Sequence, residues 1–263
     1  MVKSLLKRGY IFLIFAFLYA PIIVLAIYSF NNSRSRGAWD GFTLRWYLEM
    51  FSDRQILTSL YYSLFIGIIA SVAATFIGTM AAFGIHNMRT IPQAVVMNLN
   101  YLPVVNPDIV TAISFMLLFI FIKARLGFWT LLLAHVSFCI PYVILSVLPR
   151  IKQLDKHLYE AALDLGATPN LAFRKVVLPE IFPGVITGLL LSFTLSVDDF
   201  VISFFTTGSG VSNLAITIYS MARRGINPKI NALSTLMFVS VLILLIIVNI
   251  LAERQNTAKK KSE

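Results

Sequence analysis

Long apolar runs, each bounded by charged or polar residues, dominate the chain. A bilayer core about 30 Å thick requires about 20 mostly apolar helical residues to cross it. Six stretches meet this requirement, at about residues 10–30, 57–85, 94–122, 126–148, 181–205 and 233–252. The pattern predicts an all-α, polytopic membrane protein with six transmembrane helices, in which residues 1–263 form a single transmembrane domain.

The first run resembles a secretory signal peptide, because Lys3, Lys7 and Arg8 precede it. It is longer than the apolar region of a cleavable signal, which spans about 7–15 residues, and no small-residue cleavage site follows it. We therefore expect this run to be an uncleaved anchor helix.

Composition and charge agree with a membrane protein. The chain is 58% hydrophobic and 13% charged, with a mean hydropathy of +0.80, whereas soluble domains are nearer half apolar and a quarter charged. A single cysteine excludes a disulfide scaffold. The net charge of +10 indicates basic loops that lie against anionic lipid headgroups. We expect no nucleic-acid partner, because no basic stripe is interleaved with exposed aromatic residues.

Lysine and arginine are distributed unevenly over the loops. If both termini lie in the cytoplasm, the cytoplasmic segments hold 13 of these residues and the outer loops hold 9. Positive charge favours the cytoplasmic side of a membrane. We therefore expect both termini inside, including the polar tail at residues 253–263.

Small residues recur at every fourth position of two predicted helices. They are Ser63, Gly67, Ser71, Thr75 and Thr79 in the second run, and Gly184, Gly188, Ser192 and Ser196 in the fifth. Within lipid, small residues on one face let helix backbones approach closely. These two faces predict close packing of the bundle and no further role.

The loop at residues 150–180 is predicted to hold two short helices. The first is amphipathic and ends at Gly166, a natural C-cap. Its apolar face consists of Leu154, Leu158, Ala161, Ala162 and Leu165. The second begins at Thr168 as N-cap, and Leu178 and Pro179 are expected to stop it. The exposed apolar face could dock in a groove of a partner or lie in the lipid interface.

This loop carries a resemblance to a known family. Its fixed positions are Glu160-Ala161-Ala162, Gly166, Val176 and Leu178-Pro179. The spacing resembles the EAA signature of permease subunits in bacterial ATP-binding-cassette (ABC) importers, with Val176 in place of the usual Ile. The resemblance implies a type I importer (MetI-like) permease fold, in which this loop is the coupling helix that docks on a separate ATPase. It further implies that the coupling residues are Glu160, Ala161, Ala162, Gly166, Leu178 and Pro179.

Signatures of catalysis and nucleotide binding are absent from the sequence. There is no Gly-Lys pair, hence no phosphate-binding loop, and no HExxH or GxSxG motif. The three histidines, His86, His135 and His157, are scattered. We therefore expect a transport subunit and not an enzyme, without a cofactor or metal of its own, whose partner ATPase binds ATP and Mg.

The third run is interrupted by two prolines and an acid between residues 101 and 108. Pro107 removes a backbone donor and restricts Asn106, so the helix should break there and restart with Asn106 as N-cap. Asp108 would then lie in the first turn, where the helix dipole favours its charge. A structural role and a role in a substrate pathway both remain open for Asp108.

Two adjacent acids, Asp198 and Asp199, lie in the fifth run. Each costs about 2.5–3.5 kcal/mol at the centre of an inserting helix, so at least one is a functional candidate. Adjacent helical positions lie about 100° apart, so one acid can face a pathway while the other faces a neighbouring helix. The alternative is a carboxylate satisfied by a neighbour or screened by water near the outer mouth.

The acids indicate a cationic substrate, and Phe200 and Tyr219 offer ring faces for ammonium groups. Similar residues occur in permease subunits of spermidine/putrescine importers, and the likeness covers nearly the whole chain. It is carried by the segments at residues 19–23, 29–33, 106–110, 196–199, 218–221 and 227–228. The resemblance implies ATP-driven polyamine uptake across the bacterial cytoplasmic (inner) membrane by alternating access. It also implies a second, homologous permease subunit, two ATPase subunits and an extracytoplasmic polyamine-binding protein as partners.

Two other functions remain open at this point. A permease of the same family could carry an inorganic anion or a metal ion, because specificity lies largely with the external binding protein. A channel or transporter that needs no ATPase would have the same apolar spans.

Overall fold

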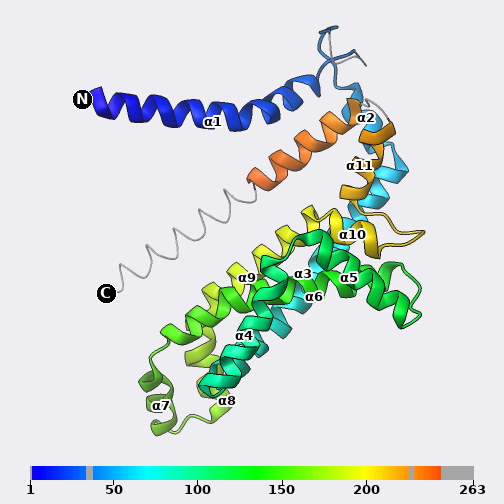
Figure 1. Cartoon of the computed structure of the whole chain (residues 1–263). Coiled ribbons are helices and arrows are strands. Elements are labelled where there is room, and N and C mark those ends of the chain that lie inside the picture. Colours follow the sequence, from blue (N-terminus) through cyan, green and yellow to red (C-terminus); the bar gives the residue numbers. More distant parts are fainter. Residues whose placement is uncertain (1, 34–37, 225–227, 244–263) are drawn as a thin grey trace. The chain divides into compact units, whose positions relative to one another are not determined.

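The computed structural model describes residues 2–33, 38–224 and 228–243 of the chain. These residues are mostly helical, and their one strand-like pairing is an isolated antiparallel bridge between Asn31 and Phe42. The chain divides into two compact units, Thr58–Thr217 and the combination of Met1–Leu57 with Ile218–Glu263 (Figure 1). The helical content confirms the prediction of an all-α protein.

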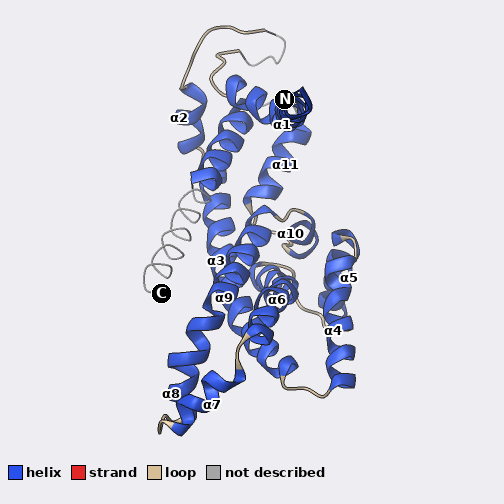
Figure 2. Ribbon diagram, turned by 90° about the vertical axis from the view of Figure 1, so that its left-hand side faces the viewer, coloured by secondary structure: helices blue, strands red, loops and turns tan. Residues whose placement is uncertain are grey.

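The unit Thr58–Thr217, called the core unit below, holds most of the predicted site residues. It contains α3 (Arg54–His86) from Thr58 onward, α4 (Thr90–Val105), α5 (Asp108–Phe121), α6 (Phe128–Gln153), α7 (Lys156–Asp164), α8 (Pro169–Ala172), a π-helical segment (Phe173–Val177), α9 (Leu178–Asp198), α10 (Val201–Thr206) and the first residues of α11 (Leu214–Arg224). Within this unit, α7 and α8 lie toward one end of α9 and α10 lies at the other (Figures 1 and 2).

Small residues let the helices of the core unit approach closely. A Cβ atom on Gly188 of α9 would lie 3.3 Å from the Cα of Val143 in α6. One on Gly67 of α3 would lie 2.8 Å from a methyl group of Val197 in α9. The predicted small-residue faces are thus packing faces. Their buried members are Ser63, Gly67, Ser71 and Thr75 on α3 and Gly184, Gly188, Ser192 and Ser196 on α9, while Thr79 is half-buried.

Four helical stretches of the described residues are long and apolar enough to cross a membrane, or five if the bent α4–α5 pair counts as one span. The four are Arg8–Tyr28, Arg54–His86, Phe128–Gln153 and Pro169–Asp198. They match the first, second, fourth and fifth predicted spans in place, and the bent pair matches the third. The predicted sixth span, 233–252, lies partly outside the described residues, and its described part belongs to an apolar helix at Pro228–Ile243.

The second unit contains α1 (Val2–Tyr28), α2 (Arg45–Phe51) and the helix Pro228–Ile243. The indole of Trp46 in α2 is buried and donates to the backbone oxygen of Asn31, at 2.7 Å. The hydroxyls of Ser29 and Tyr47 lie 2.7 Å apart. These two hydrogen bonds hold α2 against the end of α1.

The third predicted span is broken where the prolines indicated, and α4 and α5 meet at an angle of 106°. Asn106 is the C-cap of α4, with an extended ψ of 144°, and Pro107 is the N-cap of α5. The prediction of Asn106 as the N-cap was therefore wrong by one residue. Asp108 lies in the first turn of α5, as expected.

The predicted stop at Leu178 and Pro179 was wrong, because the helical run from Pro169 to Asp198 continues through both residues. Proline cannot donate to the carbonyl four residues earlier, and its ring clashes with it. Here the π-helical turn before α9 widens the backbone, and Leu178 donates to the carbonyl of Phe173 five residues earlier. Pro179 then occupies the first turn of α9, where the missing donor costs little.

Candidate substrate pathway and coupling segment

The two adjacent acids lie at the end of a helix and not in the middle of a span. α9 ends at Asp198, and Asp199 is its C-cap with an extended ψ of 123°. The residues that follow form the separate short helix α10. The prediction of a continuous fifth span to residue 205 was therefore wrong. We call the break between the two helices, at Asp199-Phe200, the α9–α10 corner.

The carboxylate of Asp199 explains why the chain breaks at this point. It accepts hydrogen bonds from the backbone N–H groups of Ile202, at 3.2 Å, and Ser203, at 2.8 Å. These are among the first N–H groups of α10, which have no partner within the helix. Asp199 therefore acts as a capping group for α10, and only 8% of its side chain is exposed.

Asp198 has a different environment. Its side chain is exposed in this chain, and among the described residues it forms no salt bridge. The two neighbouring acids therefore have different environments, as adjacent helical positions allow. The Asp199 carboxylate is hydrogen-bonded to the protein, and the Asp198 side chain is exposed.

A network of buried polar side chains surrounds the α9–α10 corner. His135 of α6 is 1% exposed, and its two ring nitrogens lie 2.8 Å from the hydroxyl of Ser196 and 2.9 Å from that of Ser203. The amide of Asn213 donates to the Ser203 hydroxyl, at 2.6 Å, and to the backbone oxygen of Asp199, at 3.3 Å. The His135 ring also lies 3.8 Å from the Asp199 carboxylate. Each of these polar groups is thereby satisfied away from water.

Sequence reasoning missed this network. His135 was treated as one of three scattered histidines, because its hydrogen-bond partners lie 61 and 68 positions away in the sequence. The available signal was a single histidine in the middle of an apolar span, opposite a helix that carries regularly spaced serines. Intramembrane polar residues of this kind pair with one another or mark a function.

The segment between α10 and α11 is fixed to the rest of the core unit. The hydroxyl of Thr130 in α6 donates to the backbone oxygen of Thr206, at 2.8 Å. The backbone N–H of Leu214 donates to the Ser63 hydroxyl in α3, at 2.7 Å. The α9–α10 corner is therefore held from both sides and has little freedom to reorient.

The other predicted pathway residues belong to separate elements of the two units. Asp108 is exposed in the first turn of α5. Phe200 is half-buried at the corner, with its ring 5.4 Å from that of Phe204. Tyr219 belongs to the second unit, where the guanidinium of Arg223 lies over its ring at 5.9 Å.

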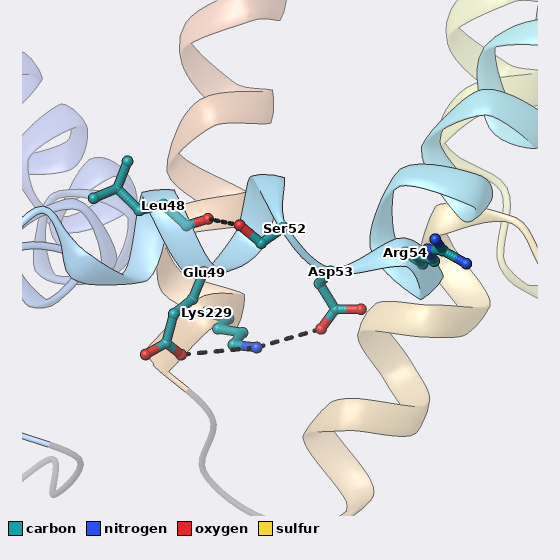
Figure 3. Close-up of a pocket in the computed structure, with 6 residues that line it drawn as sticks. All are labelled: Leu48, Glu49, Ser52, Asp53, Arg54 and Lys229. Atoms are coloured by element: carbon teal, nitrogen blue, oxygen red, sulfur yellow. Dashed lines mark hydrogen bonds and ion pairs between the residues drawn. The ribbon is translucent and has the colours of Figure 1, made fainter.

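The second unit contains an open pocket of about 580 Å³ with an ion-pair cluster (Figure 3). Its lining residues are Leu48, Glu49, Ser52, Asp53, Arg54 and Lys229. The ammonium of Lys229 lies 3.3 Å from the Asp53 carboxylate and 3.8 Å from that of Glu49. Lys229 thus connects the α2–α3 junction to the helix that begins at Pro228 (Figure 3).

The predicted coupling segment forms α7 and the turn that follows it. Asp155 caps α7 by accepting from the backbone N–H of His157, at 2.9 Å. Gly166 follows the helix with a φ of +84°, which a residue with a side chain rarely adopts. Thr168 caps α8 as predicted, accepting from the N–H of Leu171 at 3.4 Å.

The apolar face of α7 is mostly uncovered. Leu158 is 49% exposed and Leu165 is 89% exposed. Ala161 and the Glu160 carboxylate are exposed as well, and Ala162 is half-buried. Leu178 and Pro179 belong to a different element, the first turn of α9.

Comparisons with known proteins agree with this architecture. Residues 74–261 match the family described as the binding-protein-dependent transport system inner membrane component. The chain is 39% identical to the spermidine/putrescine transport system permease protein PotC of Escherichia coli K12, over 96% of each chain. It is 37% identical to PotC of Haemophilus influenzae, over 97% of this chain and 100% of that protein. It is 40% identical to the putrescine transport system permease protein PotI of Escherichia coli K12, over 84% of this chain and 82% of that protein.

Solved structures show the same fold at low sequence identity. A bacterial ABC transporter involved in the import of the acidic polysaccharide alginate aligns with a TM-score of 0.72 and 13% identity, over 96% of both chains. The MetNI methionine ABC transporter aligns with a TM-score of 0.59 and 17% identity, over 73% of this chain and 92% of that one. The chain therefore belongs to the binding-protein-dependent inner membrane component family, the permease subunits of ABC importers.

Proposed function

We propose that this chain is a permease subunit of an importer that moves polyamines of the spermidine/putrescine class across the cytoplasmic membrane. The observation that carries the proposal is the exposed carboxylate of Asp198 beside the capped carboxylate of Asp199. One uncompensated negative charge at the end of a membrane-spanning helix suits a cation, and the names of the relatives point to polyamines.

The energy for transport comes from a partner chain in this proposal. The exposed apolar face of α7, with Glu160 beside it, docks on one of two ATPase subunits, which bind ATP and Mg. A second permease subunit completes the membrane bundle, and an extracytoplasmic binding protein delivers the polyamine. Both termini lie in the cytoplasm, the orientation that the distribution of basic residues favours.

Transport proceeds by alternating access. ATP binding closes the ATPase pair, the motion passes through α7 and α8 into α9, and the bundle opens outward. Hydrolysis returns it to the inward-facing state. Asp198 replaces part of the hydration shell of one ammonium group at a time, with Asp108 and the Phe200 and Tyr219 rings as further candidates on the path.

The test is uptake of labelled spermidine and putrescine into proteoliposomes that hold the complete importer. We expect uptake to require internal ATP, the binding protein and the ATPase subunits, and Asp198→Asn to reduce it while the complex still assembles. Ser209, an exposed hydroxyl residue in the loop after α10, provides the control variant Ser209→Ala.

Two results would refute the proposal. If an inorganic anion or a metal ion abolished uptake, and an excess of polyamine left it unchanged, the substrate would be another solute. Uptake by the purified chain without any ATPase would make it a channel or an independent transporter.

A further inference from the structure

His135 is an almost fully buried titratable side chain of the core unit that the proposed mechanism leaves unused. It lies on α6, an apolar helix, where an unpaired polar group is costly because no water can satisfy it. Both of its ring nitrogens have hydroxyl partners, so the side chain is fixed in one orientation. A neutral imidazole donates from one nitrogen and accepts at the other, and the two serine hydroxyls can serve either tautomer.

The two partners lie on opposite sides of the α9–α10 corner. Ser196 lies in the last turn of α9, two residues before Asp198, and Ser203 lies in α10, four residues after Asp199. One rigid imidazole therefore joins the end of one helix to the next helix, across the break in the backbone. Asn213 reinforces the same junction through the Ser203 hydroxyl and the Asp199 carbonyl.

The direction of Asp198 depends on this junction. Asp199 uses its carboxylate to bind the amides of α10, and this contact fixes the turn from Asp199 to Ser203. Asp198 is the last residue of α9, so the angle between α9 and α10 sets the direction of its carboxylate relative to that turn. The contacts of His135 with Ser196 and Ser203 hold this angle, so the relative direction of the two carboxylates depends on the network and not on the two residues alone.

From this geometry we infer that His135 is a positioning residue for transport: by holding Ser196 and Ser203 together across the α9–α10 corner, it fixes the direction of the Asp198 carboxylate toward the cation. The inference rests on the proposed function. It assigns His135 no contact with the substrate and no transfer of a proton.

The experiment measures polyamine transported per ATP hydrolysed by the complete importer in proteoliposomes. His135→Leu removes both hydrogen bonds that join Ser196 to Ser203 and is expected to lower this ratio by about tenfold or more. His135→Gln, which keeps a donor and an acceptor, is expected to retain more of it. Ser146→Ala is the matched control, because within the described part of the chain this hydroxyl of α6 donates only to the Tyr142 carbonyl of its own helix.

A double-mutant comparison separates positioning from simple packing. If His135 acts through Asp198, then His135→Leu will change the ratio little in an Asp198→Asn background. The inference would be overturned if His135→Leu lowered the transport ratio by the same factor in the wild-type and the Asp198→Asn backgrounds. It would also be overturned if the ratio of His135→Leu equalled that of the wild type. If His135→Leu does not assemble, Ser203→Ala decides, since it removes the contacts of Ser203 with His135 and Asn213 and leaves the His135–Ser196 contact in place. A normal ratio in that variant would overturn the inference.

The proposed function fails separately. If the wild-type complex transports no polyamine, the substrate assignment is wrong whatever the variants do. If the wild type transports polyamine and all the His135 and Ser203 variants match it, only the positioning role is wrong.

Discussion

The loop between α10 and α11 offers a test of how tightly the α9–α10 corner is held. Gly208 has a φ of +63°, in the left-handed region, and a Cβ atom at this position would lie 2.5 Å from the backbone oxygen of Leu126. An alanine here meets two penalties. The left-handed conformation costs about 1–2 kcal/mol, and the contact forces a backbone shift that costs about 1–3 kcal/mol.

Gly210, two residues further along, is the matched control. Its φ of +107° is also positive, but no atom of the described residues lies within 4 Å of a Cβ atom at this position. Gly210→Ala therefore meets only the conformational penalty, about 1–3 kcal/mol. The two penalties of Gly208→Ala add to about 2–5 kcal/mol, so this variant should be the less stable of the two.

The assay compares the unfolding of the two variants with that of the wild type. Purified complexes in nanodiscs are heated, and the fraction that remains assembled is followed by size-exclusion chromatography. We expect the midpoint temperatures to fall in the order wild type, Gly210→Ala, Gly208→Ala. Equal midpoints for the two variants would show that the loop does not press against Leu126, and the account of a fixed corner would then lose one of its supports.

Three further predictions concern the acids and the coupling segment. Asp199→Ala should destabilise the complex by about 1–2 kcal/mol, the value of a lost helix cap, whereas Asp198→Asn should leave thermal stability unchanged; identical melting curves for Asp199→Ala and wild type would contradict the capping role. Glu160→Lys should uncouple ATP hydrolysis from uptake, and normal uptake per ATP would tell against docking through α7. Lys229→Met should cost no more than about 1 kcal/mol, since partly exposed ion pairs contribute little, and a large drop in melting temperature would show that its pocket is a more critical junction.

The sequence was sufficient for features that depend on local chemistry. The α4–α5 break follows from Pro107, which lacks a donor and restricts its neighbour. Gly166 ends the coupling segment because a positive φ favours glycine. The packing faces of α3 and α9 follow from small residues at every fourth position. In each case a few adjacent residues determine the outcome.

The features that could not be predicted depend on contacts between distant residues. The end of the fifth span at Asp198 depends on Asp199 binding the amides of α10, and hydropathy alone cannot distinguish this from a continuous span. The passage of the helix through Pro179 depends on a π turn that no propensity indicates. His135 acquires its partners only when α6 lies beside α9.

The different environments of Asp198 and Asp199 have a consequence for the rate of the proposed transport. A site with two free carboxylates would hold a polyamine, which carries several ammonium groups, by two charges at once, and a transit site that binds its cation tightly slows release. In the α9–α10 corner one of the two charges is already satisfied by backbone N–H groups, which leaves one free carboxylate. If the corner lies on the substrate pathway, as proposed, the hydrogen bonds of Asp199 weaken its hold on the polyamine and so favour fast release. On this reasoning a variant that frees Asp199 while keeping the fold should bind substrate longer and transport it more slowly.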